Sequence, residues 1–501
     1  MIVALSVVAA VGCGYLYMLN STIGIVFGSA FCIAFAVLFV VFSVRVKAQK
    51  SRLRVAIAFG LALALSLSAF TVAVVYYDSW KANEVSGYKY VSGRVCAIDT
   101  GTGAYRINLE DLYIDGKNVD GILRLNVRAA DNNIAELIDY GDMLSFGAYV
   151  NGIKLFDNGV VNGYAYRTDI RFTATVNSSD VSVRFGTPSG MESFMNSMRD
   201  VLLQNMGDKY GIFAFSMITG DKYAFDADMT AYYSAAGIGH IIAVSGLHVG
   251  FLALVLNLIL CKVKRKVRFP IILAVLCAYT VIADFSPSVI RAVIMTAISG
   301  AAFIFSGRRD LLSSLLCAFS FMLAVKPLYM FEAGFLMSFG AIFGIALFAN
   351  SMRLFLCKHG VHDKIANGVG ASVSASVGVA PSLAYFMNRV QIFAIIVNVI
   401  LLPYVSIVFI SLVCLLPIAA IPGCGQALVV CKYLIIPLDY VAYGISLIPY
   451  ASFGIKSGAA VYLSYPIMFC ASDYLIVKRE KRIIALYSFA VIVALFAVLA
   501  V

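Results

Sequence analysis

Charged residues are scarce in this chain of 501 residues: they make up 13%, against roughly 25% in soluble globular domains. That scarcity excludes an ordinary soluble protein. Hydrophobic residues reach 61%, and the mean hydropathy is +0.90. The composition therefore predicts an integral membrane protein.

Patterns that bind metals or nucleotides are also missing. The four histidines stand at positions 240, 248, 359 and 362, and no HExxH, CxxC or Walker A pattern occurs. His240 and His248 would lie about 80° apart around a helix, which is poor geometry for chelating one ion. We therefore expect no metal site and no cofactor. Cys96 is the one cysteine away from the apolar segments, so no disulfide is expected in the polar part of the chain.

Long apolar runs recur along the chain. A helix needs about 17 to 25 such residues to cross a bilayer, and the runs predict thirteen transmembrane helices. Residues 2–19 lack the charged leading region and cleavage site of a signal peptide, so we expect a retained helix. The thirteen predicted spans are 2–19, 22–44, 55–77, 234–260, 269–284, 288–306, 311–326, 331–349, 366–387, 391–418, 425–450, 457–477 and 483–501.

Lysine and arginine cluster in alternate short loops. The groups lie at 45–54, 262–268, 308–309, 353–364 and 478–482. Basic residues mark the cytoplasmic side, so the N-terminus of this multi-pass protein is predicted inside and the polar island after the third span outside. These loops account for all of the net charge of +11, so that charge does not argue for a nucleic-acid partner.

Between about 88 and 185 the pattern changes to short alternating segments. Three strands, one short helix and two further strands are predicted, with the helix at 132–138 and the last strand over 170–185. This order favours a small antiparallel barrel of the OB type, inserted on the extracytoplasmic side of a polytopic α-helical membrane protein. The predicted divisions are 1–77 (first helices), 78–190 (OB-like domain), 191–232 (amphipathic surface segment), 233–425 (transmembrane core) and 426–501 (last helices).

One face of the third strand carries Arg124, Asn126 and Arg128. OB barrels bind single strands with a basic groove and stacking aromatics, and Tyr88, Tyr90, Tyr105 and Tyr113 are nearby in sequence. The alternative is an ordinary solvent face on a half-buried strand. Residues 78–200 carry a net charge of −4, which favours that alternative.

Ionisable residues inside membrane spans are costly, so each is a candidate for function. Most lie near predicted outer ends, where they line a wet vestibule or simply meet water. Asp439 is the exception, because it lies deeper, in the eleventh span. The set is His240, His248, Asp284, Arg291, Glu332, Arg389 and Asp439.

The stretch "GIGHIIAVSGLHVG" at 237–250 opens the fourth span. Gly246 and Gly250 give a GxxxG step that lets helices approach closely or lets the helix break. Ser245 with His248 three residues later is compatible with an intramembrane serine hydrolase, although a base that close on one helix is badly placed to take the hydroxyl proton.

The stretch "DFSPSVIR" at 284–291 contains a proline between two predicted spans. Pro287 cannot continue a helix, and Ser286 can satisfy a freed backbone group, so a tight external turn or a broken helix is expected. Asp284 and Arg291 could pair across it.

Four ordered blocks resemble the ComEC-type competence proteins. They are "ITGDKYAFDADMTAYYSAAGIGHIIAVSGLHVG" (218–250), "DFSPSVIRAVIM" (284–295), the block 307–345 and the block 371–404. The resemblance implies an inner-membrane channel that passes one DNA strand into the cytoplasm during natural transformation. Its signature positions are Asp221, His240, Ser245, Gly246, His248, Ser286, Pro287, Arg291 and Arg389.

Longer members of that family continue into a metallo-β-lactamase-like domain, whose HxHxDH cluster this sequence lacks. We therefore expect a pore that is not an enzyme, working with single-stranded DNA, membrane lipid, a separate nuclease, a DNA receptor protein and a cytoplasmic ATPase. A related permease for another substrate, or a serine hydrolase using Ser245, is the alternative. The sequence leaves the oligomeric state open.

Overall fold

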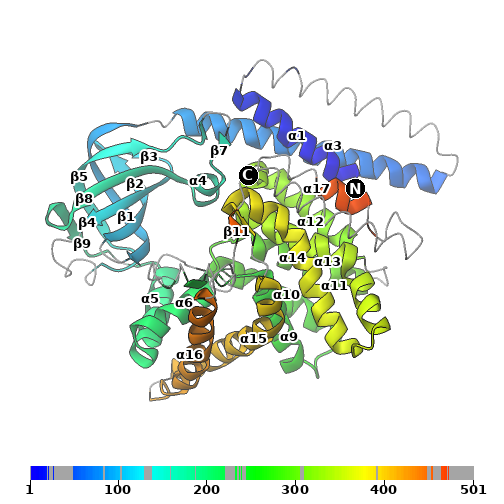
Figure 1. Cartoon of the computed structure of the whole chain (residues 1–501). Helices are drawn as coiled ribbons and strands as arrows, with labels where there is room; N and C mark the ends of the chain where they lie inside the picture. The colour runs from blue at the N-terminus through cyan, green and yellow to red at the C-terminus, as the bar shows by residue number, and fades with distance from the viewer. Residues whose placement is uncertain are drawn as a thin grey trace.

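The computed structural model combines a β-barrel with a larger helical part, and the barrel lies to one side of the helices (Figure 1). It describes residues 2–19, 49–82, 85–101, 104–128, 138–157, 160–186, 188–220, 244–304, 310–390, 393–421, 423–447, 453–454 and 464–470, with isolated residues at 21, 26, 229, 232–233, 236, 239 and 472.

Five strands close the barrel. They are β1 (Gly87–Gly101), β2 (Ala104–Ile114), β4 (Ile122–Arg128), β5 (Met143–Gly152) and β8 (Ile170–Asn177). They are paired in the order β1-β2-β4-β8-β5, and β1 pairs with β5 to close the ring. The five-stranded Greek-key barrel predicted from the sequence is therefore present.

Two details of the predicted barrel are wrong. The β4–β8 pair is parallel, so the domain is not wholly antiparallel. The single strand predicted over 170–185 is two strands, because the 3₁₀ turn Ser178–Asp180 separates β8 from β9 (Val181–Arg184). Strand β8 pairs with one end of β5, and β9 pairs with the other. The predicted helix at 132–138 falls outside the described residues except for Ile138. The short strands β3 (Lys117–Val119), β6 (Phe156–Asp157) and β7 (Val160–Val161) complete the domain.

The barrel core follows from the alternation of its strands. In β4 the buried positions are Leu123, Leu125 and Val127, while the intervening side chains are only partly buried. Phe146 of β5 and Phe172 of β8 meet them inside the barrel. Period-two burial of this kind is what fixes the register of a strand.

Helices occupy most of the predicted membrane spans. Five are long and apolar enough to cross a membrane by length and composition, namely Gly60–Lys81, Ala333–Lys358, Asp363–Met387, Val399–Ala419 and Ala427–Ser446. Spans 22–44 and 483–501 lie outside the described residues, so thirteen crossings stay a prediction. The larger helices and helical turns are α1 (Ile2–Leu19), α3 (Gln49–Ala82), α5 (Gly190–Met206), α6 (Asp208–Thr219), α9 (Gly246–Ile259), α10 (Arg265–Ile282), α11 (Pro287–Ile304), α12 (Leu311–Val325), η3 (Pro327–Phe331), α13 (Ala333–Lys358), α14 (Asp363–Met387), α15 (Phe393–Ala419), α16 (Ala427–Ser446) and α17 (Ser464–Cys470).

The predicted span 234–260 is not one continuous helix, and the break that the glycine-rich stretch allowed is present. Ser245 has an extended backbone, with φ −111° and ψ 162°, and α9 begins only at Gly246. The cause is local, because the Ser245 side chain accepts a hydrogen bond from the Leu247 backbone N–H and so caps the helix. The fourth apolar run is therefore interrupted near its middle.

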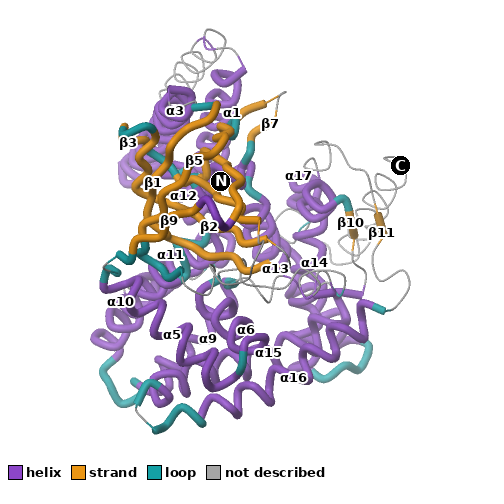
Figure 2. The backbone as a smooth tube through the Cα atoms, turned by 90° about the vertical axis from the view of Figure 1, so that its left-hand side faces the viewer, coloured by secondary structure: helices purple, strands orange, loops and turns teal. Residues whose placement is uncertain are grey.

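The buried apolar residues of the helices form two large clusters. The first joins α5, α6, α9, α10, α15 and α16, and the second joins α1, α3, α12, α13 and the chain between β5 and β8. Helix α11 belongs to both, because Val289 and Val293 pack in the first cluster and Met295 packs in the second. It therefore lies along the seam between these two helical groups. Figure 2 shows the barrel strands in the upper part of the molecule and α5, α6, α9, α10, α15 and α16 together below them.

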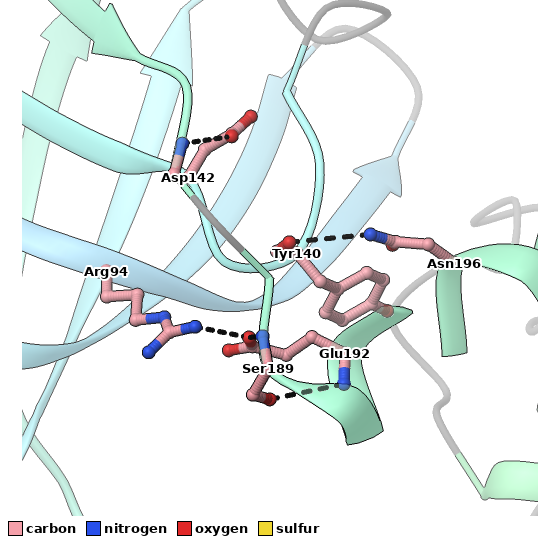
Figure 3. A network of polar contacts seen from close by, with 7 residues as sticks. Arg94, Tyr140, Asp142, Ser189, Glu192 and Asn196 are labelled. Carbon is pink, nitrogen blue, oxygen red and sulfur yellow. Dashed lines mark hydrogen bonds and ion pairs between the residues drawn. The ribbon is translucent and has the colours of Figure 1, made fainter. Parts of the chain in front are cut away.

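Helix α5 is fastened to one end of the barrel (Figure 3). Its capping box pairs Ser189 with Glu192, and Arg94 of β1 forms an ion pair with the same Glu192 carboxylate. Asn196 of α5 donates to the Tyr140 carbonyl at 3.4 Å. The predicted amphipathic surface segment is thus held against the barrel at its start.

Candidate functional site

The start of α9 brings two predicted residues together. The Nδ1 atom of His248 accepts the Ser245 backbone N–H at 3.1 Å, so Ser245 and His248 form a reciprocal cap. The Ser245 hydroxyl lies 3.5 Å from the same nitrogen. His248 is 1% exposed and packs on the Phe409 ring with centroids 4.5 Å apart. Its first role in the fold is therefore to define where the helix begins.

Gly246 makes room for Arg291. A Cβ atom placed at position 246 would lie 2.3 Å from the Nη2 atom of Arg291, so the guanidinium would have to shift to admit any side chain there. Gly250 differs, because a Cβ there would meet no described atom within 4 Å. Among the described residues, a close approach is therefore seen at Gly246 and not at Gly250.

Arg291 is a buried cation with little compensation. It is 5% exposed, donates to the Ser338 carbonyl oxygen and lies with its Cζ atom 5.8 Å from the centre of the Phe339 ring. Among the described residues it forms no ion pair with a carboxylate, and its Nε atom has no hydrogen-bond partner. It also faces the N-terminus of α9, where the helix dipole is positive. This surrounding favours an anion beside the guanidinium.

The stretch 284–291 forms a tight turn followed directly by a helix. Asp284 and Phe285 both have positive φ angles, 45° and 46°, and Pro287 is the first residue of α11, where its missing N–H costs nothing. The Ser286 carbonyl accepts the backbone N–H of Ile290 at 3.0 Å. The predicted Asp284–Arg291 pair is wrong, because the Arg291 guanidinium instead donates to the Ser338 carbonyl oxygen and no ion pair joins these two described residues.

Three further predicted residues cannot be placed as side chains. Asp221 and His240 lie outside the described residues. The backbone of Arg389 forms strand β10 (Arg389–Val390) with β11 (Phe453–Gly454), and nothing further is described at that position.

On the barrel, the predicted basic face is only partly free. Arg124 donates to the Tyr164 hydroxyl at 2.8 Å and to the Asn108 side chain at 3.4 Å, whereas Arg128 is exposed. Tyr164 belongs to α4 (Gly163–Thr168), in the connection between β5 and β8. Arg124 therefore helps to position that connection.

The tyrosines form a surface that the sequence indicated only in part. Tyr88, Tyr90 and Tyr113 are exposed at 74%, 58% and 44%, and Tyr149 of β5 stands directly opposite Tyr88. Gly147 leaves room for the Tyr88 ring, since a Cβ there would lie 2.6 Å from its hydroxyl. The signal for Tyr149 was its place in the alternation of β5.

A second polar contact joins α6 to a membrane-spanning helix. Asp439 of α16 is 7% exposed and accepts a hydrogen bond from Lys209 Nζ at 2.6 Å and another from the Tyr232 hydroxyl. Burial lowers the pKa of Lys209, but the hydrogen bond and charge of Asp439 outweigh it, so the pKa is raised. The sequence singled out Asp439, because an aspartate within an apolar span is unusual. It did not indicate the partner Lys209, which is 230 residues away in the chain.

The described residues contain no group of three or more His, Cys, Asp or Glu side chains that could hold a metal ion. The site at α9, α11 and α13 instead offers one guanidinium, a helix N-terminus and a capped serine. These groups can hold or guide an anion.

Comparison with known proteins agrees with the sequence blocks. Residues 217–481 match the family model described as "Competence protein". The chain is 24% identical over 263 residues to ComE operon protein 3 of Bacillus subtilis (strain 168), a match that covers 51% of this chain and 32% of that relative's length. No solved structure matches the chain. Because the family model covers more than half of its residues, this membrane protein belongs to the competence protein family.

Proposed function

We propose that this protein is a membrane channel that passes single-stranded DNA into the cytoplasm during natural transformation. The observation that carries the proposal is Arg291, buried at the seam between two helical groups without a carboxylate partner among the described residues. A DNA phosphate would supply the negative partner that this guanidinium lacks among the described residues. A phosphate in turn needs a nearby positive charge to cross the hydrocarbon region of the membrane.

The interruption of the fourth apolar run supports the same proposal. In membrane proteins, backbone that is not helical at membrane depth lies in protein or beside a water-filled space. Ser245 and Gly246 stand at this interruption, next to Arg291. A passage that opens here would meet the guanidinium and the N–H groups of α9 together.

The hydrolase alternative is less well supported by the geometry. A serine nucleophile needs a base that is free to take its proton, but the Nδ1 atom of His248 already accepts the Ser245 backbone N–H. A permease for another anionic substrate would use the same groups, and the substrate measured in the experiment below separates it from a DNA channel.

In this proposal the N-terminus is cytoplasmic and the barrel is extracytoplasmic. The strand would reach the barrel from a DNA receptor protein, after a separate nuclease has degraded its complement, and a cytoplasmic ATPase would supply the driving force.

The test is uptake of labelled DNA by the native host, with the wild type compared with a deletion strain and a strain in which the chain is restored. We expect the deletion to keep DNA bound at the cell surface while label disappears from the cytoplasm. Unchanged cytoplasmic label in the deletion strain would refute the channel. If the deletion strain takes up DNA normally but no longer takes up another anionic substrate, the permease is favoured.

A further inference from the structure

A large cavity lies where the barrel meets the helices. Its volume is about 1610 Å³, and its wall is built from α1, α12, α13, α14, Tyr465 of α17 and the connection between β5 and β8. Figure 1 shows α4 of that connection between the barrel and the helices. In OB barrels the corresponding connection is a common place for ligands to bind.

The wall of this cavity is mainly apolar, and nine of its 25 residues are aromatic. Its charged residues are Lys154, Asp157 and Glu332, and Glu332 marks the start of α13. The wall continues along α13 from Ala333 to Phe343, ten residues or about 15 Å further. The aromatic side chains on which the argument rests are Phe319, Phe331, Phe339, Phe343, Tyr385 and Tyr465.

The rim of the cavity is firmly held. Gly163 packs against the backbone of Phe331 so closely that a Cβ would lie 2.2 Å from the carbonyl oxygen. Tyr166 meets Tyr329 edge to face with ring centroids 5.9 Å apart, and Trp80 of α3 donates to the Ile153 carbonyl at 2.8 Å. The opening is therefore a fixed feature of the junction.

We propose that this cavity binds the bases of the single strand on its way from the barrel to the membrane passage. This inference rests on the proposed function. Aromatic rings stack on any base whatever its sequence, as a channel for DNA of arbitrary sequence requires. The cavity is also larger than the 300 to 1,000 Å³ typical of small-molecule sites, which leaves room for more than one nucleotide.

The cavity adjoins the Arg291 site. Phe339 lines the cavity, and the same ring lies 5.8 Å from the Arg291 guanidinium carbon. A strand whose bases stack in the cavity would thus bring its phosphates towards the buried cation. A lipid acyl chain is the competing occupant. Aliphatic side chains would bind an acyl chain as well as aromatic rings do, so the aromatic residues favour a base over a lipid.

The experiment uses the full chain in lipid nanodiscs. It compares binding of an oligothymidine with binding of an abasic oligonucleotide of the same length and backbone charge. The test variant is the double change Phe319→Leu with Phe343→Leu. The matched control is Phe321→Leu on the same helix, because Phe321 is 51% exposed and does not line the cavity.

We expect the wild type to prefer the oligothymidine by about 5-fold or more for each stacked base. The double variant should lose most of that preference, and the Phe321 control should keep it. If the double variant fails to fold, Phe343→Leu alone supplies the comparison.

Equal affinity of the wild type for both oligonucleotides would overturn the proposal. So would native mass spectrometry that finds a lipid retained by the wild type and the control but absent from the double variant. The proposed channel function has a separate test: normal DNA uptake in the deletion strain would refute it, whatever the cavity binds.

Discussion

If the protein is a DNA channel, Arg291→Met should impair DNA uptake strongly while changing the stability of the fold little. Taking a guanidinium out of water costs several kcal/mol, and a buried Nε without a partner adds about 1 to 3 kcal/mol. The hydrogen bond to the Ser338 carbonyl returns about 1.5 to 3 kcal/mol and the Phe339 ring about 2 kcal/mol. The two sides nearly balance, so replacing the cation with an apolar side chain of similar length should cost the fold little.

We therefore expect Arg291→Met to keep the free energy of unfolding within about 2 kcal/mol of the wild type, or to raise it. DNA uptake should nevertheless fall at least about tenfold, which is the rate effect of losing about 1.4 kcal/mol of interaction with the phosphates. The two measurements are thermal unfolding of the purified protein and cytoplasmic label in cells with matched membrane levels. A strongly destabilised variant would show that Arg291 is a structural residue, and normal uptake would remove it from the path.

Two glycines of the same helix provide the control. Gly246→Ala would push a Cβ to 2.3 Å from Arg291 Nη2, whereas Gly250→Ala meets open space among the described residues. Alanine in a helix interior is better than glycine by about 0.5 to 1 kcal/mol, so Gly250→Ala should melt at the same or a higher temperature and keep uptake. Gly246→Ala should impair uptake. Identical behaviour of the two variants would contradict the placement of Arg291 against α9.

Three further predictions concern the supports of the site. Lys209→Met leaves the Asp439 carboxylate buried without its cation and should lower thermal stability by more than Asp439→Asn does; the reverse order would refute the pairing. Glu332 caps α13 and lies 3.7 Å from Arg167, so Glu332→Ala should cost about 0.5 to 2 kcal/mol and Glu332→Gln less, as unfolding in denaturant would measure. The hydrogen bonds of Asp115 from Lys89 and the Tyr90 N–H lower the pKa of its carboxyl. Their stabilising effect is therefore present above the unfolded pKa of about 3.9 and is lost as pH falls through the lower folded value. The protection factors of the β1 amides, which are corrected for the intrinsic slowing of exchange in acid, should accordingly fall in acid for the wild type and depend less on pH in Asp115→Asn, and equal acid responses would contradict it.

The sequence predicted elements well where one physical signal dominates. Long apolar runs predicted α10 to α16, although α13 continues to Lys358 beyond its predicted end at 349, and alternation in segments such as 122–128 predicted the barrel strands. The position of the break at Ser245 was left open, because the apolar residues on both sides favour a helix whereas Gly246 permits a break. In the structure the Ser245 hydroxyl caps the start of α9 and so fixes the place.

Contacts between side chains from different parts of the fold could not be predicted from the sequence, for a different reason. Asp284 and Arg291 are seven residues apart, and their pairing was expected from that nearness alone. In the structure the backbone turns sharply at Asp284 and Phe285, and the Arg291 guanidinium instead donates to the Ser338 carbonyl oxygen inside the helical part. Which group a buried cation meets depends on how the helices pack, and no local pattern encodes that.

The arrangement of charge offers a physical reason why a strand could both enter and leave. A dense basic groove would hold a polyanion, whereas conduction needs sites that bind weakly enough to release it. The aromatic cavity offers stacking with few charges, and Arg291 adds one cation beside Phe339, where the strand would leave the cavity. The basic loops at 262–268 and 478–482, on the predicted cytoplasmic side, would then attract the strand after that single cation. Reversing charge in the 262–268 loop should therefore slow the appearance of label in the cytoplasm without changing oligonucleotide binding at the cavity. An equal loss of both would show that the loop acts on the fold and not on the path.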